Sequence, residues 1–314
     1  MVNWQAKRDA IEYAKAVPAG PGRTLLRERY WELRHKIWEG WQALPDSPIV
    51  VRVLAGIIPI VLVTGLGLSV NTLFKSEPTR SQGEELAALL KRSAAGAPKD
   101  GQRLLVVGDF TAYAMALAVD GTYNGRGVRG IGYGIFGCGI VDGAAMVSGK
   151  AVALRNDCKA WRADFTTLTE QFNPTTTVLT TGLLESFDLV VNGKTLLTQA
   201  PDTQAYLGEQ LAETHRILSA KGSRLLLATI ARCSPGSADP RTEWINSVWR
   251  DYAKKHPDQY SLADLDAKVC QNGRSIDASP GNPVYNDEAM TRAGARYIWE
   301  WYSELARGQS TAQS

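Results

Sequence analysis

Over the last two thirds of the chain, short apolar runs typical of strands are each followed by a loop and a segment with helical spacing. The predicted strands are Arg103–Val107, Thr177–Thr180, Arg224–Ile230 and Tyr260–Leu262, and the predicted helices are Ala112–Val119, Asp202–Ala220, Thr242–Lys255 and Thr291–Arg307. Strands that alternate with helices in this way predict an α/β fold with a parallel sheet covered by helices on both faces.

Functional sites in such sheets form where the strands end, at their carboxyl edge. The segments that follow the predicted strands are Gly108–Phe110, Thr181–Glu185, Ala231–Cys233 and Asp264–Asp266. We therefore expect any candidate site to be built from these four segments.

An uncharged apolar run, Val53–Phe74, precedes this domain. Its 22 residues are long enough to cross a hydrocarbon core of about 30 Å as a helix. The run is apolar on every side, which argues against an amphipathic core helix, and it starts too far into the chain for a cleavable signal peptide. We predict one transmembrane helix within residues 49–74.

Basic residues concentrate on the amino-terminal side of this span. Residues 1–48 carry Lys7, Arg8, Lys15, Arg23, Arg27, Arg29, Arg34 and Lys36. The positive-inside rule then predicts a cytoplasmic N-terminus and an extracytoplasmic C-terminal domain in a single-pass protein of the cell membrane. Residues 24–41 have the spacing of a basic amphipathic helix, which fits either the inner membrane surface or a partner protein.

Between the span and the domain, residues 75–100 are rich in charge, Ser, Ala and Gly, and they predict a stalk with a helix at Glu84–Arg92. The folded domain is expected over residues 101–307, and residues 308–314 are expected to be a disordered tail. The composition, 44% hydrophobic and 21% charged, is that of a globular protein. A net charge of +3, located mainly beside the span, gives no indication of nucleic-acid binding.

All four cysteines follow the span, in the part of the chain predicted to face an oxidising compartment. Three pairings are possible, and we favour Cys138 with Cys158 and Cys233 with Cys270. Buried free thiols are the alternative.

Several short motifs occur in the order of a known superfamily. They are Gly108-Asp109, Gly137-Cys138-Gly139-Ile140, Cys158 with Trp161, Gly182-x-x-Glu185, Asn246, Asp264-Leu265 and Thr291-x-x-Gly294-Ala295. Residues 101–306 thereby resemble an SGNH/GDSL hydrolase, most closely the extracytoplasmic SGNH domain associated with bacterial membrane O-acyltransferases. The resemblance implies a three-layer, flavodoxin-like α/β/α domain and places a backbone oxyanion donor around Gly137.

The same resemblance shows which catalytic positions differ. In the family a nucleophilic Ser follows Gly-Asp, and here that position is Phe110, which has no lone pair to attack with. The family's Asp-x-x-His block aligns with Asn286 and Ala289. No histidine follows residue 256, because the chain has only His35, His215 and His256, each of which we interpret as structural.

Substitute chemistry has little support in the sequence. Thr111 carries a hydroxyl, but it lies about 100° around the helix from the lost nucleophile. Asp109 is expected to cap a helix, and Glu185 and Asp188 lack a placed partner. No cofactor is indicated, nor a metal, because His and Cys do not occur at ligand spacing. The Gly125–Gly130 run matches a dinucleotide pattern formally, yet it predicts a loop and a glycine-rich strand.

Three hypotheses of function remain open. The first is a pseudoenzyme of the cell envelope that binds a glycan or acylated lipid, or scaffolds a membrane acyltransferase or transporter, through a vestigial cleft. That cleft comprises Asp109, Phe110, Gly137, Gly182, Glu185, Asn286 and Ala289. The second is an active esterase or O-acyltransferase with non-standard residues. The third is a structural subunit of a membrane complex.

Overall fold

The computed structural model describes residues 82–94, 101–135, 137–147, 149–233, 239–286 and 289–308. They belong to one compact unit, Ser81–Ser314. The predicted transmembrane span, the basic segment 1–48 and the tail from residue 309 lie outside the described residues. Within the described part, no helix combines the length and the apolar character needed to cross a membrane.

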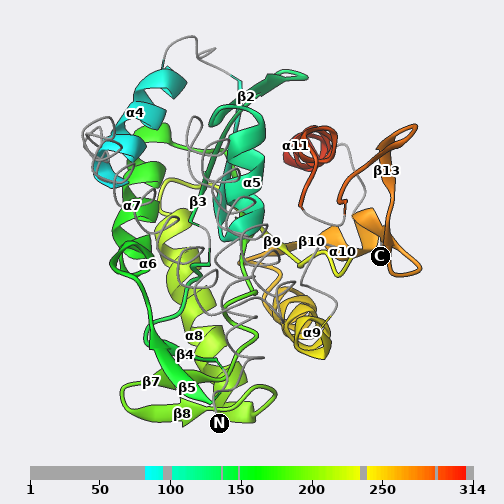
Figure 1. Cartoon of the computed structure of the whole chain (residues 1–314). Helices are drawn as coiled ribbons and strands as arrows, with labels where there is room; N and C mark the ends of the chain where they lie inside the picture. The colour runs from blue at the N-terminus through cyan, green and yellow to red at the C-terminus, as the bar shows by residue number, and fades with distance from the viewer. Residues whose placement is uncertain are drawn as a thin grey trace, which may run out of the picture. The chain divides into compact units, whose positions relative to one another are not determined.

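A six-stranded sheet forms the centre of the domain, in the order β10-β9-β6-β1-β3-β2 (Figure 1). Its parallel strands are β1 (Gln102–Gly108), β3 (Val128–Gly134), β6 (Thr176–Thr180), β9 (Arg224–Ala228) and β10 (Ser261–Ala263). Their order is that of flavodoxin-like folds. The edge strand β2 (Thr122–Gly125) pairs antiparallel with β3, so the sheet is mixed rather than wholly parallel as predicted.

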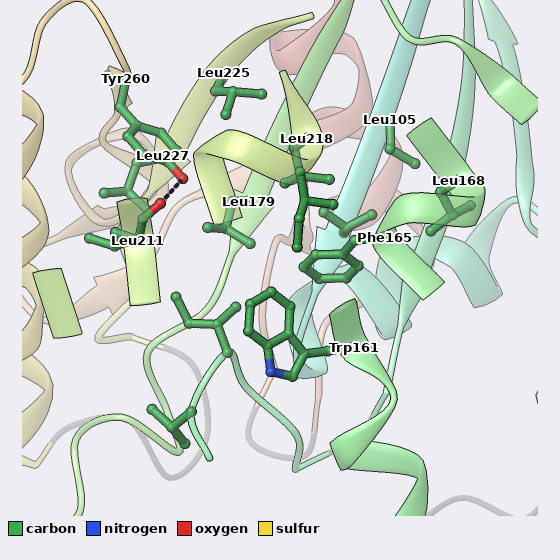
Figure 2. Packing of buried hydrophobic residues seen from close by; sticks show 14 of the residues in the cluster. Leu105, Trp161, Phe165, Leu168, Leu179, Leu211, Leu218, Leu225, Leu227 and Tyr260 are labelled. Atoms are coloured by element: carbon green, nitrogen blue, oxygen red, sulfur yellow. Dashed lines mark hydrogen bonds between the residues drawn. The ribbon is translucent and has the colours of Figure 1, made fainter. Parts of the chain in front are cut away.

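Alternate residues of β1 face two different cores, which explains why the strand reads as a continuous apolar run. Leu105 and Val107 pack into the core covered by α7 (Trp161–Phe172), α8 (Pro201–Leu218) and α9 (Pro240–Lys255). Figure 2 shows part of this core, where the Tyr260 hydroxyl donates to the Leu211 carbonyl at 2.9 Å. Leu104 and Val106 face the other core, with α5 (Phe110–Ala118), α10 (Leu265–Val269) and α11 (Arg292–Ala306). The predicted three-layer arrangement is present.

Within the described residues, the strands and helices predicted from periodicity are found, with ends that differ by at most two residues. The predicted amphipathic helix at 24–41 lies outside the described residues. Other elements differ from the prediction. The short helix α6 (Asn156–Lys159) and α7 were not predicted, and neither were the two hairpins before α11. These hairpins are β11 (Cys270–Gln271) with β12 (Arg274–Ser275), and β13 (Asp277–Ser279) with β14 (Asn282–Pro283).

The predicted stalk is also corrected. Residues 82–94 form helix α4 (Gln82–Ala94), whose Leu86, Leu89 and Leu90 are buried in the core shared with α7. The helix is therefore part of the domain, which begins before the predicted boundary at Gly101. The prediction was wrong because the overall composition of 75–100 outweighed the three- and four-residue spacing of these leucines.

A second, four-stranded antiparallel sheet has the order β5-β4-β7-β8. The hairpin β4 (Ala144–Val147) and β5 (Lys150–Ala153) follows β3, and the hairpin β7 (Leu189–Val191) and β8 (Lys194–Leu196) follows β6. Both hairpins are thus inserted after the carboxyl ends of parallel strands. We call this sheet the rim sheet, because it extends the edge where a site is expected.

Candidate functional site at the carboxyl edge

The end of β1 positions the first predicted site residue, Asp109. Gly108 has a φ of +139°, and a β-carbon there would lie 1.8 Å from the Thr180 carbonyl oxygen, so the position requires glycine. The Asp109 amide donates to that same carbonyl at 2.8 Å. The Asp109 side chain then accepts from the amides of Thr111 at 3.1 Å and Leu183 at 3.5 Å. Asp109 caps α5, as predicted, and joins the ends of β1 and β6.

Phe110 is the first residue of α5 and is half-buried. It lies at the start of the helix that follows the first strand, the position that the sequence resemblance aligns with the family's nucleophile. The neighbouring Thr111 contributes its amide to the Asp109 cap. Within the described residues, no histidine lies beside Phe110 or Thr111 at the carboxyl edge of the sheet.

His215 lies in the last turn of α8, and His256 caps the end of α9. These helices lead into β9 and β10 respectively, so both histidines lie toward the amino edge of the parallel sheet. His215 packs edge-on against Tyr260, and His256 packs against Tyr252. Their placement agrees with the structural role predicted for them.

Glu185 is completely buried and holds the glycine-rich loop against the end of β6. Its Oε1 accepts from the Ile140 amide at 2.7 Å and from the Thr181 hydroxyl at 2.8 Å. A β-carbon on Gly139 would lie 2.0 Å from this oxygen. Burial raises the pKa of Glu185, and Oε2 has no hydrogen-bond partner within the described residues.

Asp109 and Glu185 interact electrostatically. Burial is the main cause that raises the pKa of Asp109 to about 7, and the negative charge of Glu185 adds to it. Asp188, the other acid noted in the sequence, instead accepts from the Thr198 amide at 2.6 Å and belongs to the rim sheet connection. The structure thus brings together two of the three carboxyls.

Helix α9 fixes the segments that follow β6 and β9. Asn246 bonds both the amide and the carbonyl of Ile230 at 2.8 Å. The indole of Trp249 donates to the Thr181 carbonyl at 2.8 Å. Gly182 has a φ of +139°, and a β-carbon there would approach the Trp249 indole nitrogen to 2.9 Å. Gly182 is therefore needed for the tight passage of this loop.

Asn286 and Ala289 occupy a closed turn before α11. The Asn286 amide donates to the Ala289 carbonyl at 3.1 Å, and the Ala289 amide donates to the Asn286 side chain at 2.8 Å. Ala289, which the sequence resemblance aligns with the family's histidine, carries only a methyl group. Tyr285, the residue before Asn286, lies near Asp109. Burial raises the pKa of Tyr285, and the negative charge of Asp109 raises it further.

Tyr285 and Tyr302 are buried residues near Asp109 that sequence reasoning missed. Burial is the main cause that raises the pKa of Tyr302, followed by the charges of Tyr285 and Asp109. The Tyr302 hydroxyl has no partner within the described part of the chain. The apolar spacing of α11 indicated that Tyr302 is buried, but its neighbourhood depends on how the helix docks.

Both favoured disulfides are present. Cys138–Cys158 ties the glycine-rich loop to α6, and Cys233–Cys270 ties the end of β9 to the end of α10. Cys138 and Cys158 lie close to Asp157, but their sulfurs are bonded to each other and offer no thiolate to a metal. Gly137 lies in the turn before Cys138, with a φ of +70°. Residues 125–130 form the predicted turn and strand, since β2 and β3 are joined there.

Several solved structures of hydrolases are similar to this domain. A GDSL-like lipase from Bacteroides thetaiotaomicron is 12% identical, with a TM-score of 0.47 over 72% of this chain and 98% of that chain. An acylhydrolase described from Bacteroides fragilis is also 12% identical, with a TM-score of 0.47 over 71% and 96%.

The domain is also similar to an acetylxylan esterase from Geobacillus stearothermophilus, with 14% identity and a TM-score of 0.37 over 66% of this chain and 94% of that chain. No protein-family model and no curated protein matches the chain. At these identities the likeness concerns the fold, so the function has to be argued from the residues described above.

Proposed function

We propose that this protein is a membrane-anchored, catalytically degenerate SGNH-like protein of the bacterial cell envelope. Its domain binds an envelope glycan or lipid, or acts as a scaffold in the acyl modification or transport of that molecule. It works beside a membrane acyltransferase or transporter. The observation that carries the proposal is Phe110, which opens α5 at the position of the family's nucleophile.

The contrast between the intact frame and the replaced chemical groups supports this proposal. Gly108, Asp109 and Glu185 make the close contacts that hold the strand ends and the glycine-rich loop together. A phenyl ring at position 110 forms no acyl-enzyme, and a methyl group at position 289 takes no proton. A sequence that preserves the cleft without its nucleophile or base is suited to binding.

Phe110 also suggests what the cleft binds. Its half-buried ring follows a buried carboxyl, so an apolar surface lies next to a hydrogen-bonding group. Such a pair suits an acyl chain or the C–H face of a sugar. Anchoring of the domain to a membrane is supported by the apolar run Val53–Phe74, and its extracytoplasmic location is supported by two disulfides, which are typical of oxidising compartments.

The test uses the full-length protein in detergent with a serine-reactive fluorophosphonate probe and p-nitrophenyl acetate. We expect no labelling and no turnover above buffer. A Phe110→Ser, Ala289→His double variant restores the two missing groups, and Phe110→Ser alone is its matched control. Gain of labelling in the double variant alone would identify the cleft as a degenerate hydrolase site. Labelling of the unaltered protein would contradict the proposal.

A second candidate function is favoured by the coupled carboxyls. Asp109, with a pKa of about 7, has the acidity of a general acid or base at neutral pH. An esterase using this group would show turnover that disappears in Asp109→Asn and follows the ionisation of Asp109 with pH. Turnover that persists in Asp109→Asn would exclude this candidate.

A further inference from the structure

A hollow of about 460 Å³ lies on the side of the domain, away from the carboxyl edge. Its wall includes Asp120 after α5, Tyr123 and Asn124 of β2, and Arg292 and Arg296 of α11. We call it the lateral hollow. It shares no residue with Asp109, Phe110, Gly182 or Glu185, and it lies at the end of α5 opposite to the one that Asp109 caps.

The walls of the lateral hollow are held in place by packing. The Tyr123 ring stacks on the buried Trp299 with ring centroids 5.1 Å apart and an angle of 5° between the planes. The Trp299 indole in turn donates to the Met115 carbonyl at 3.0 Å. Arg126, which also lines the hollow, is bound by Glu300 at 3.0 Å and Glu304 at 2.6 Å. Tyr123 and Arg126 therefore present fixed surfaces.

Arg292 and Arg296 differ from Arg126 because neither has an ion-pair partner within the described residues. Both are exposed and lie four residues apart on α11, on the same face of the helix. Like charges at this spacing repel each other and destabilise a helix slightly. Neighbouring residues Ala295, Ile298 and Trp299 are buried, so the helix is fixed and both arginines extend from the same exposed face of it. Two unpaired guanidinium groups beside a hollow suit a carboxylate or phosphate.

The rest of the wall indicates more than a simple anion. Asp120 makes no ion pair in the described part of the chain, and a carboxylate of this kind can accept hydrogen bonds from the hydroxyl groups of a ligand. The Asn124 amide both donates and accepts, and the Tyr123 ring offers an apolar face. The volume lies within the range of small-molecule pockets. We propose that the lateral hollow binds an acidic saccharide, with its anionic group on Arg292 and Arg296.

Calorimetric or ligand-observed NMR titration of the full-length protein with D-glucuronate, D-glucose and inorganic phosphate tests this proposal. We expect glucuronate to bind at least about tenfold more tightly than glucose, because glucose lacks the charge that the arginines recognise. Glucuronate should also bind more tightly than phosphate, which cannot use Asp120 or Tyr123. The affinity for glucuronate should fall as salt is added.

The decisive variant is Arg292→Gln, Arg296→Gln, which should lose at least about tenfold in glucuronate affinity with an unchanged melting temperature. Arg274→Gln is the matched control, because Arg274 is equally exposed and lies outside the hollow. Unchanged affinity in the double variant, equal loss in the control, or equal binding of glucose would overturn the proposal. Absence of glucuronate binding would also overturn it without affecting the proposed function of the cleft, which the fluorophosphonate test decides.

Discussion

The carboxyl of Glu185 packs directly against the backbone of Gly139, so closely that a β-carbon on Gly139 would lie 2.0 Å from Oε1. The glycine loop therefore reaches its place only because residue 139 has no side chain. The same carboxyl receives the amide of Ile140, the next residue, so the close approach and the hydrogen bond depend on each other.

Gly139→Ala should destabilise the domain by about 1–3 kcal/mol, because the neighbouring atoms are buried and have little room to move. Gly208→Ala is the control. Gly208 lies within α8, and an added β-carbon there has ordinary contact with Tyr252 at 3.6 Å. The control should be neutral or stabilised by up to about 1 kcal/mol. Chemical denaturation of both variants measures the difference, and equal stabilities would refute the packing argument.

The carboxyl of Asp109 should make stability depend on pH. Its pKa is raised from 3.8 to about 7 on folding, so between these values the folded state holds a proton that the unfolded state has released. The contribution of this group to the free energy of unfolding is therefore largest below about pH 4, and it decreases as the pH rises to about 7. Denaturation from pH 4 to pH 8 should show this decrease relative to Asp109→Asn. Parallel pH profiles in the two proteins would exclude it.

Removal of the charge on Glu185 should move this pH dependence. In Glu185→Gln, burial still raises the pKa of Asp109, but the repulsion from a second carboxylate is absent. The decrease in stability should then occur at lower pH than in the unaltered protein. NMR titration of the Asp109 carboxyl measures the shift directly, and an unchanged midpoint would show that the two groups are not coupled.

Trp249→Phe should cost about 1–3 kcal/mol, because it leaves the buried Thr181 carbonyl without its indole donor. Trp301→Phe is a matched control in the other core, where the indole makes no hydrogen bond within the described residues. The Trp249 variant should be the less stable of the two on thermal unfolding. A larger loss in Trp301→Phe would indicate that Trp249 stabilises the domain through its packing and not through this hydrogen bond.

Loss of either disulfide should destabilise the domain by about 3–4 kcal/mol, as expected for loops closed over separations of 20 and 37 residues. Paired Cys→Ser substitutions and denaturation measure this cost. The two losses should differ in effect, because only Cys138–Cys158 holds the glycine loop of the candidate cleft. Protein isolated from cells with free thiol quenching should contain no reactive cysteine, and reactive thiols would contradict the predicted extracytoplasmic location.

The sequence predicted the doubly wound sheet because long buried strands and amphipathic helices have distinct periods. The rim sheet was missed because its strands have three or four residues, and β5 is exposed along its whole length. Asp109, Glu185 and the position of Phe110 were found through motifs. The electrostatic contact of Asp109 with Tyr285 and Tyr302 was not, because it brings together residues far apart in the chain and depends on how α11 docks.

The rim sheet also affects how the domain assembles. Its central pairing joins β4 to β7, which come from different crossover connections, so neither hairpin has its partner until the parallel strands have brought their loops together. The rim therefore forms after the main sheet and has few strands to stabilise it. Its amides should exchange with solvent by local opening while those of β1 and β6 remain protected, so the rim can open without unfolding of the body of the domain.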